Sequence, residues 1–327
     1  MTDEEYNEKL AAVRRSVEKQ FGKNTVMKLG DNPNTNIEGF HTGSFALDRA
    51  IGGNGFPVGR VIELFGMPSS GKTSLALRTI ATVQKAGGHV LFIDAEHALD
   101  CAWAEKLGVN VPELELNQPS YGEEGLTVAF EYIAGGCAQL VVVDSIAAMA
   151  PKAQMDGEFT DSHVGLQARM MSKAMPKFLK MCVDNKATLL LLNQMRTNIG
   201  NKYEPMTTPG GVAVKFSSSV RMKLTSSVIK KGDEKIGTKV NCWIVKNKVA
   251  PPFTNASFEI HANGIRHDLD ILDTATDAKI IQRTGGWYKY NGENIGQGRD
   301  NAADYIMSNP EVLSDITAKL KAPREES

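Results

Sequence analysis

The strongest chemical pattern in the chain is the run Gly66-Met67-Pro68-Ser69-Ser70-Gly71-Lys72-Thr73, which fits G-x-x-x-x-G-K-[S/T] at every specified position. Glycines in such a loop let backbone N–H groups converge on phosphate oxygens. The lysine can reach the β- and γ-phosphates, and the threonine hydroxyl can ligate magnesium. The run therefore predicts a phosphate-binding loop. The alternative is a Gly/Ser-rich turn between a strand and a helix.

The residues on either side have the pattern of the elements that must position this loop. Residues 60–65 form a short apolar run that is typical of a strand. Residues 73–85 carry apolar side chains at helical spacing, and two glycines at 87 and 88 end the helix. The order strand, loop, helix brings the positive end of the helix against the phosphates.

Two further predicted strands are followed by acidic residues. Residues 89–93 lead to Glu96, and the unbroken apolar run from residue 140 ends at Asp144. Ligands in open α/β sheets bind beyond the carboxyl ends of the strands, so both acids are expected to face the nucleotide. Asp144 is predicted to hold magnesium, and Glu96 to orient and deprotonate the attacking water. The position of Glu96 is equally compatible with a different role, as the N-terminal cap of a helix over residues 98–107.

A fourth predicted strand, residues 188–192, is followed by Asn193 and Gln194. An amide at this place can hydrogen-bond a γ-phosphate and report its presence to the segment that follows. That segment, residues 195–211, is a long loop, and residues 155–164 form a second one. The first contains Arg196 and Lys202 for phosphates and Ile199 and Tyr203 for bases, and the second leads into a helix with Arg169 and Lys173, which favours a nucleic-acid contact. The alternative is two flexible surface loops.

Composition limits the class of protein. The chain has 327 residues, of which 42% are hydrophobic and 23% charged, with a formal net charge of -1. This balance argues against a protein that coats nucleic acid by bulk charge, so such contacts must be concentrated on particular loops. With no membrane-length apolar run and an acidic start, a cytoplasmic protein without membrane contact is expected. The four cysteines, without metal-ligand spacing, are predicted to be buried free thiols.

The ends of the chain differ from its centre. Thr2 and Glu5 have capping-box spacing and open an amphipathic helix, which the polar residues 31–36 separate from the rest. This arm must be covered by the chain's own core or by a neighbouring subunit. We predict an α/β fold with a mostly parallel sheet: a P-loop ATPase core at residues 37–267, an N-terminal arm at 1–36 and a small α+β domain at 268–327.

Taken together, these motifs resemble the bacterial RecA family of strand-exchange recombinases along nearly the whole chain. The resemblance is carried by ordered blocks: Ser69-Ser70-Gly71-Lys72-Thr73, Phe92-Ile93-Asp94-Ala95-Glu96-His97-Ala98-Leu99-Asp100, Asp161-Ser162-His163, Gly165-Leu166, Ala168-Arg169-Met170-Met171-Ser172, Lys246-Asn247-Lys248 and Ile295-Gly296-Gln297-Gly298.

The resemblance implies an ATP-dependent recombinase for DNA repair and the SOS response. Such a protein forms helical filaments on single-stranded DNA, exchanges strands with homologous double-stranded DNA and hydrolyses ATP with magnesium. It implies a LexA-like repressor and single-strand-binding or mediator proteins as further partners. Competing interpretations of the same core are a ring-forming helicase-type motor and an ATP-switched scaffold or co-protease filament.

The resemblance also implies roles for single residues. Those of the catalytic site are Glu96, Lys72, Gln194, Lys246 and Lys248, with both later lysines crossing to the neighbour's nucleotide and Phe216 transmitting a signal between subunits. Nucleotide contacts are expected at Gly66, Met67, Pro68, Ser69, Ser70, Gly71, Lys72, Thr73, Ser74, Asp100, Trp103 and Asp144. DNA contacts are expected at Val164, Arg169, Ser172, Arg196, Thr197, Asn198, Ile199, Gly200, Thr208, Gly210 and Gly211. Judged from the sequence pattern alone, a tryptophan on a helix, such as Trp103, is ordinarily a packing residue.

Overall fold

The computed structural model of the chain describes residues 1–23, 25, 26, 28, 38–158, 160, 161, 165–197 and 206–322. These residues divide into two compact units, Met1–Ile37 and Glu38–Ser327. The predicted linker at residues 31–36 lies outside the described residues.

The first unit contains helix α1 (Asp3–Phe21). Its capping box is confirmed, because the Thr2 hydroxyl accepts from the Glu5 N–H at 3.3 Å and the Glu5 carboxylate accepts from the Thr2 N–H at 2.9 Å. No residue of α1 is buried, and Tyr6 and Phe21 on the apolar stripe are 54% and 66% exposed. The described part of this unit therefore supplies no cover for the stripe.

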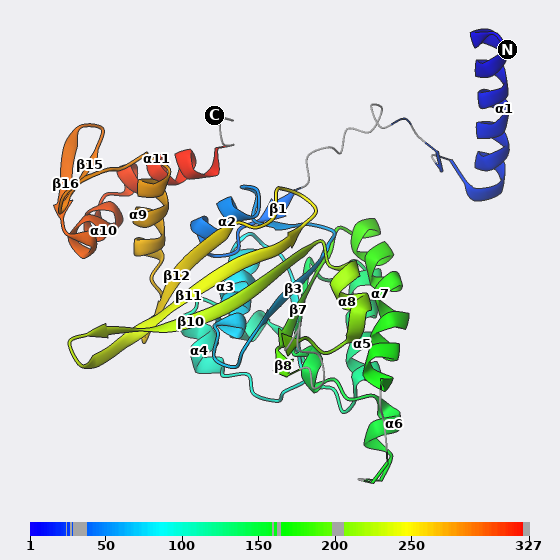
Figure 1. Ribbon diagram of the computed structural model, residues 1–327, viewed down its shortest axis with the longest axis horizontal. Coiled ribbons are helices and arrows are strands. Elements are labelled where there is room, and N and C mark those ends of the chain that lie inside the picture. Colours follow the sequence, from blue (N-terminus) through cyan, green and yellow to red (C-terminus); the bar gives the residue numbers. More distant parts are fainter. Residues whose placement is uncertain are drawn as a thin grey trace. The chain divides into compact units, whose positions relative to one another are not determined.

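Within the described residues, a nine-stranded sheet forms the centre of the second unit (Figure 1). Its order is β13-β12-β11-β10-β3-β7-β6-β4-β5. Neighbours run parallel from β10 to β5 and antiparallel from β10 to β13, which confirms the predicted α/β core. The strands are β3 (Val61–Gly66), β4 (Val90–Asp94), β5 (Glu115–Asn117), β6 (Leu140–Asp144), β7 (Thr188–Gln194), β10 (Val220–Lys231), β11 (Glu234–Asn247), β12 (Asn255–His261) and β13 (Gly264–Ile265).

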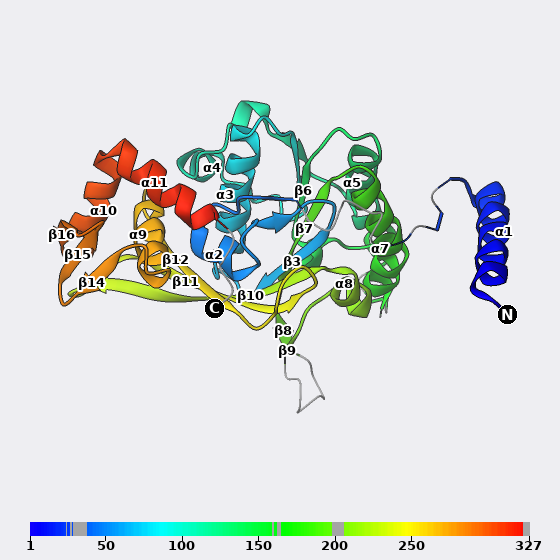
Figure 2. The same cartoon turned by 90° about the horizontal axis from the view of Figure 1, so that it is seen from above.

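Helices cover both faces of this sheet (Figure 2). Successive strand residues alternate between the two faces, so Ile62 packs in the cluster with helix α3 and Val61 in the cluster with helix α7. Apolar residues on both faces explain the continuous apolar runs of the sequence. One face carries α2 (Phe45–Ala50), α3 (Lys72–Lys85) and α4 (Cys101–Lys106); the other carries α5 (Gly122–Ala134), α7 (Leu166–Asp184) and α8 (Gly211–Ser217).

A separate apolar cluster organises the C-terminal part of this unit. The sequence of this part predicts a helix with Leu269, Leu272, Ala275 and Ile280 and a hairpin through residues 290–293. The hairpin is confirmed by the pairing of Tyr290 with Glu293, whereas the helix ends before Ile280. The elements are α9 (His267–Asp277), β14 (Gln282–Thr284), β15 (Trp287–Tyr290), β16 (Glu293–Gln297), α10 (Arg299–Ser308) and α11 (Pro310–Lys321). Short elements elsewhere are β1 (Gly39–Phe40), β2 (Phe56–Pro57), α6 (Lys152–Met155) and the 3₁₀ turns Val111–Glu113 and Ile146–Ala148.

The segment predicted as a structureless loop over residues 195–211 is partly ordered. Strands β8 (Arg196–Thr197) and β9 (Met206–Thr207) pair antiparallel at its base, and α8 begins at its last residue. The prediction was wrong for these ends, since two-residue strands carry no periodicity that a sequence pattern could reveal. Residues 198–205 lie outside the described residues.

The prediction of four buried thiols was wrong for two of them. All four cysteines are free, but only Cys182 and Cys242 are buried, whereas Cys101 and Cys137 are exposed. Cys101 begins α4 and Cys137 lies in the turn after α5, where neighbouring elements do not cover them. Burial raises the pKa of the Cys182 and Cys242 thiols to about 12, so both stay protonated and unreactive near neutral pH.

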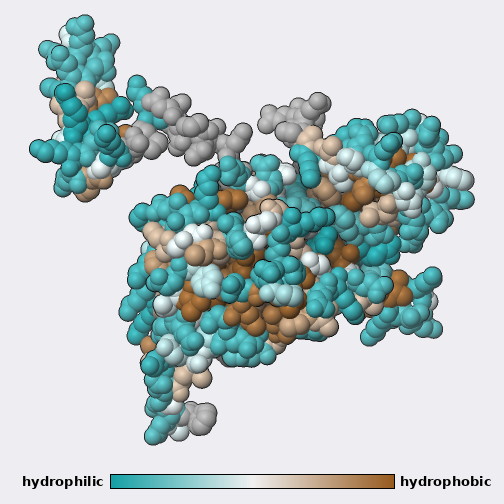
Figure 3. Space-filling view, turned by 180° about the vertical axis from the view of Figure 1, so that it is seen from behind, coloured by the Kyte–Doolittle hydropathy of each residue, from teal (hydrophilic) through white to brown (hydrophobic). Residues whose placement is uncertain are grey.

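Apolar side chains also reach the surface. On the face shown in Figure 3 they gather in one region among hydrophilic residues. Among the described residues, no helix is long and apolar enough to cross a membrane.

A buried carboxylate joins α9 to the start of α2. Asp270 is 3% exposed, and its oxygens accept from the Ser44 hydroxyl at 2.7 Å and from the Phe45 N–H at 2.6 Å. Burial raises the pKa of Asp270 from 3.8 to about 6, although these donors act in the opposite direction. The folded protein therefore holds a proton there that the unfolded chain releases at lower pH.

This shift predicts how stability depends on pH. Between about pH 4 and pH 6 the folded state binds more protons at Asp270 than the unfolded state does, so its contribution falls by about 3 kcal/mol as pH rises through this window. Asp270→Asn removes that contribution. Urea unfolding of both proteins at pH 4, 5 and 6 should give a difference in free energy of unfolding that moves in favour of the variant as pH rises; a constant difference contradicts the assignment.

Candidate nucleotide site

The predicted phosphate loop joins β3 to α3 and requires glycine at two places. A Cβ on Gly66 would lie 2.3 Å from the Leu224 carbonyl oxygen, so only glycine allows β10 to approach so closely. Gly71 has φ +92°, and a Cβ there would lie 2.7 Å from Val240 Cγ2. The glycines thus press the loop against β10 and β11 and present its backbone N–H groups at the N-terminus of α3.

Lys72 lies inside the loop with 7% exposure. Its Nζ donates to the Met67 carbonyl at 2.9 Å and to Gly66 O and Ser70 Oγ, each at 3.3 Å. Burial lowers the pKa of Lys72, while Asp144 and Glu96 act to raise it. Loop carbonyls and two nearby carboxylates therefore keep a poorly solvated ammonium at the point where the phosphates of a nucleotide would lie.

Thr73 and Asp144 are brought together, as predicted for a magnesium site. The Thr73 hydroxyl donates to Asp144 Oδ2 at 2.7 Å. Asp144 is 8% exposed, and burial raises its pKa to about 6, with Glu96 and Asp94 acting in the same direction and Thr73 and Lys72 against it. A buried carboxylate beside a hydroxyl and other acids is an oxygen donor set that a divalent cation fits. The Asp144–Ser145 peptide bond is cis.

The Glu96 carboxylate meets two polar side chains from neighbouring strand ends. Its Oε1 accepts from Gln194 Nε2 at 2.6 Å and from Ser145 Oγ at 2.5 Å. The alternative in which Glu96 caps the following helix is wrong, because α4 starts at Cys101 and its cap is Asp100, which accepts from the Trp103 N–H at 3.0 Å. Glu96 is thus free of any capping role.

The turn that carries Glu96 is fixed by a residue to which the sequence pattern assigned no role. Asp94 is 2% exposed, and its oxygens accept from the backbone N–H groups of Ala98 and Leu99 at 3.2 and 3.1 Å. The Gln118 amide donates to the same carboxylate at 3.0 Å. Its place at the last residue of β4, directly before Ala95-Glu96, is the signal that could have identified it.

The predicted nucleotide contact Trp103 lies beside the phosphate-loop helix. Its indole N–H donates to Ser74 Oγ at 3.1 Å, which links α4 to the first turn of α3. Asp100 lies at the start of the same helix. The structure therefore brings Ser74, Asp100 and Trp103 to one side of the loop.

Lys246 and Lys248 occupy the end of β11 and the residue after it. Lys246 Nζ donates to the carbonyls of Lys215 and Phe216 at 2.8 and 2.9 Å, and burial together with Lys248 and Arg221 lowers its pKa. In the described part of the chain, neither lysine hydrogen-bonds to the phosphate loop or to Glu96. Phe216 and Val212 on α8 are 73% and 60% exposed, which leaves this group of residues open to a second molecule.

The predicted DNA contacts that lie among the described residues fall into three groups. Arg169 and Ser172 lie on α7, and Arg196 and Thr197 are exposed on β8. Gly210 and Gly211 open α8 with φ +86° and +74°, and the buried Thr208 hydroxyl has no hydrogen-bond partner among the described residues. Val164, Asn198, Ile199 and Gly200 lie outside the described residues.

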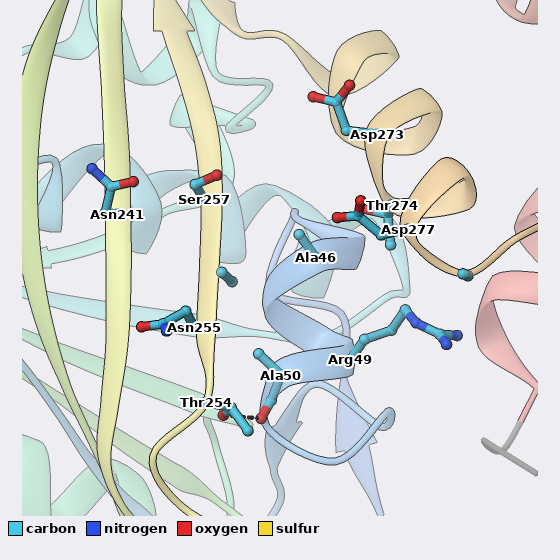
Figure 4. A pocket seen from close by; sticks show the side chains of 12 residues that line it. Ala46, Arg49, Ala50, Asn241, Thr254, Asn255, Ser257, Asp273, Thr274 and Asp277 are labelled. Carbon is cyan, nitrogen blue, oxygen red and sulfur yellow. Dashed lines mark hydrogen bonds between the residues drawn. The ribbon is translucent and has the colours of Figure 1, made fainter. Parts of the chain in front are cut away.

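A separate pocket of about 780 Å³ opens between α2, β11, β12 and α9 (Figure 4). Asn241, Asn255 and Ser257 line its strand wall, and Asp273 and Asp277 its helix wall. None of the residues that line this pocket belongs to a motif of the sequence.

The similarity to known proteins extends over almost the whole chain. The family model described as RecA N-terminal domain matches residues 8–266, and that described as RecA C-terminal domain matches residues 269–324. Protein RecA of Streptococcus mutans is 48% identical over 314 residues, which are 94% of this chain and 82% of that protein. Protein RecA of Clostridium novyi is 46% identical over 321 residues, or 96% and 92% of the two chains. Protein RecA of Staphylococcus carnosus is 44% identical over 322 residues, or 98% and 91%.

Proposed function

The chain belongs to the RecA family, and from this premise we propose how its residues divide the work of an ATP-dependent DNA recombinase. As a member of the family it binds ATP and DNA, acts as a DNA-dependent ATPase and assembles with copies of itself into filaments. The assignment of each step to a residue is the proposal.

The observation that carries the proposal is the convergence of four strand ends on one point. β3 leads to Lys72, β4 to Glu96, β6 to Asp144, and β7 to Gln194. Contacts of 2.5 to 2.7 Å join Glu96 to Gln194 and Ser145, and Thr73 to Asp144. Such a constellation at the carboxyl ends of parallel strands suits phosphoryl transfer, in which the protein positions the groups and stabilises charge.

The ATP phosphates would lie along the backbone N–H groups of residues 66–73, with the Lys72 ammonium neutralising charge on the β- and γ-phosphates. Magnesium would be held by Thr73 Oγ1 and, through water, by Asp144; when bound it neutralises phosphate charge. Glu96 would orient the attacking water and accept its proton. Gln194 would move its amide from Glu96 to the γ-phosphate, which reports that ATP is bound.

Single-stranded DNA would contact the ends of the segment from Arg196 to Gly211 and the start of α7. Arg196 supplies a charge for the phosphates, and the two glycines at 210 and 211 allow the backbone to approach the DNA closely. The LexA-like repressor and mediator proteins that the family resemblance implies remain part of this proposal.

Electron microscopy tests the assembly. With single-stranded DNA and a slowly hydrolysed ATP analogue we expect helical filaments, and with homologous duplex added, joint molecules on a gel. Closed rings with unwinding of a duplex in one polarity would instead support a helicase-type motor and contradict the proposal.

Salt dependence tests the placing of Arg196. Because each phosphate contact releases counterions, the affinity for single-stranded DNA should fall steeply with salt, and Arg196→Ala should flatten the plot of log K against log salt by about one unit. Fluorescence anisotropy with a labelled oligonucleotide measures this slope. Lys186→Ala is the control, since Lys186 is also exposed, pairs with Glu38 at 3.3 Å and precedes the opposite end of β7, so its loss should leave the slope unchanged. An unchanged slope in the Arg196 variant would move that residue off the phosphates.

A further inference from the structure

A buried charge lies in the strand that leads to the phosphate loop. Glu63 of β3 is 0% exposed and accepts from Arg221 Nε of β10 at 2.5 Å. The Arg221 guanidinium lies 4.7 Å from the centre of the Phe65 ring, so both partners of the ion pair are packed in place. A buried ion pair of this kind is costly unless further hydrogen bonds satisfy its remaining oxygens.

Asn193 supplies that further hydrogen bond and makes two others. Its Nδ2 donates to Glu63 Oε1 at 2.9 Å and to the Pro209 carbonyl at 3.0 Å, while its Oδ1 accepts from the Gln194 N–H at 3.0 Å. The side chain is fully buried. One amide thus connects the strand before the phosphate loop, the backbone of Gln194 and the residue that precedes Gly210.

The contacts of this amide with Gln194 and Pro209 lead to different sites. Gln194 bonds Glu96 at the nucleotide, and Pro209 lies between Thr208 and Gly210 in the segment proposed to bind DNA. The contact with the Glu63–Arg221 pair is the strongest of the three, because a hydrogen bond to a charged group is stronger than one between neutral groups. If Gln194 moves, the contact to the neutral Pro209 carbonyl is the one that gives way.

We propose that Asn193 is a positioning residue that couples the state of the nucleotide, sensed at Gln194, to the DNA-binding segment at Pro209, with the Glu63–Arg221 pair as its anchor. The inference rests on the functions proposed above for Gln194 and for residues 208–211. It adds a specific physical connection between them, in which one buried amide transmits a backbone shift from the end of β7 to the start of α8.

The coupling can be measured as a ratio. The affinity for a labelled single strand is determined by anisotropy with and without a slowly hydrolysed ATP analogue, and the ratio of the two values is the coupling factor. We expect a factor of about ten or more in the wild type and less than about threefold in Asn193→Ala. Nucleotide affinity and DNA affinity without nucleotide should stay within about threefold, which a general loss of structure would not allow.

Two variants serve as references. Gln194→Ala removes the proposed sensor and should lose the coupling factor as well. Asn185→Ala is the matched control, since the Asn185 amide also donates to a backbone carbonyl, that of Met181 at 3.2 Å, but in the turn before the other end of β7. It should keep the wild-type factor.

A charge exchange separates coupling from stability. Asn193→Asp places a carboxylate against Glu63 and should lower the thermal midpoint. When Glu63→Gln is added, the new amide donates to the new carboxylate, so the hydrogen bond returns in the reverse direction. The carboxylate at position 193 still has no donor for the Pro209 carbonyl. We expect the double variant to recover the midpoint and not the coupling factor. Recovery of both would overturn the inference, and this double variant decides the matter if Asn193→Ala does not fold.

The outcomes also separate the inference from the function on which it rests. A wild type without any coupling factor would overturn the roles of Gln194 and residues 208–211, and the inference with them. A wild-type factor that is lost in Gln194→Ala but kept in Asn193→Ala would overturn the inference alone.

Discussion

Lys72→Ala will hydrolyse ATP at about one thousandth of the wild-type rate or less on single-stranded DNA. The Lys72 ammonium lies within 3.3 Å of two loop carbonyls and would stabilise charge on the β- and γ-phosphates. Removing one preorganised hydrogen-bond donor from a poorly solvated site lowers the rate by roughly two to three orders of magnitude. Removing a full positive charge lowers it further.

A matched control is available on the same helix. Lys85 is exposed at the C-terminal end of α3, and Lys85→Ala should keep the wild-type rate. Thermal melting without nucleotide tests misfolding as the cause, because a variant that still shows a cooperative transition is folded. Turnover in Lys72→Ala near the wild-type value would show that the loop does not bind phosphates productively.

The order of motifs along the chain was enough to predict the core of this fold. A phosphate loop between a strand and a helix, followed by apolar runs that end in Asp144 and Gln194, is compatible with few architectures, since parallel strands place these ends on one edge. The positions of β3, β4, β6 and β7 were accordingly predicted to within two residues, whereas the three-residue strand β5 was not predicted. What those runs could not show is which side chains meet across the edge.

Glu96 illustrates that limit. A carboxylate two residues after a strand and just before a helical pattern suits a cap as well as a base, and local sequence cannot choose between them. The structure excludes the capping role for Glu96, because Asp100 caps α4 instead. The catalytic role stays a prediction.

The Glu63–Arg221–Asn193 network was missed because its members are far apart in sequence. The signal for Glu63 was nevertheless present, since a charged residue inside an apolar run expected to be buried on both faces needs a partner. The sequence pattern is typical of strands at residues 219–224 and 239–245, but the β10–β11 hairpin extends further. Its outer part, which pairs out to Lys231 with Glu234, is exposed and polar and therefore lacks apolar alternation.

The assembly of the active site from two subunits leads to the second large effect. If Lys246 and Lys248 act on the neighbour's γ-phosphate, each complete site joins Lys72 and Glu96 of one subunit to the lysines of the next, as an arginine finger supplied in trans does. The exposed Phe216 beside these lysines is consistent with a surface that a second copy covers. Lys248→Ala and Glu96→Asp should then each hydrolyse ATP poorly alone.

Mixed one to one on single-stranded DNA, these two variants should regain about a quarter of the wild-type rate. In a randomly mixed filament, about one interface in four joins an intact Glu96 to an intact Lys248, and charge stabilisation at such a site is worth orders of magnitude. A mixture of Lys72→Ala with Glu96→Asp is the matched control. Both residues belong to the same half of the site, so every site in that mixture keeps one defect and the rate should stay low.

The two mixtures decide between a shared and a self-contained site. Co-assembly is established first, with differently labelled variants in one filament. Recovery in the Lys248 mixture and not in the Lys72 mixture places the lysines across the subunit interface. Equal failure of both mixtures would mean that Lys248 serves its own subunit or none. In that case the contacts of Lys246 with the Lys215 and Phe216 carbonyls would be structural, holding the end of α8 against β11.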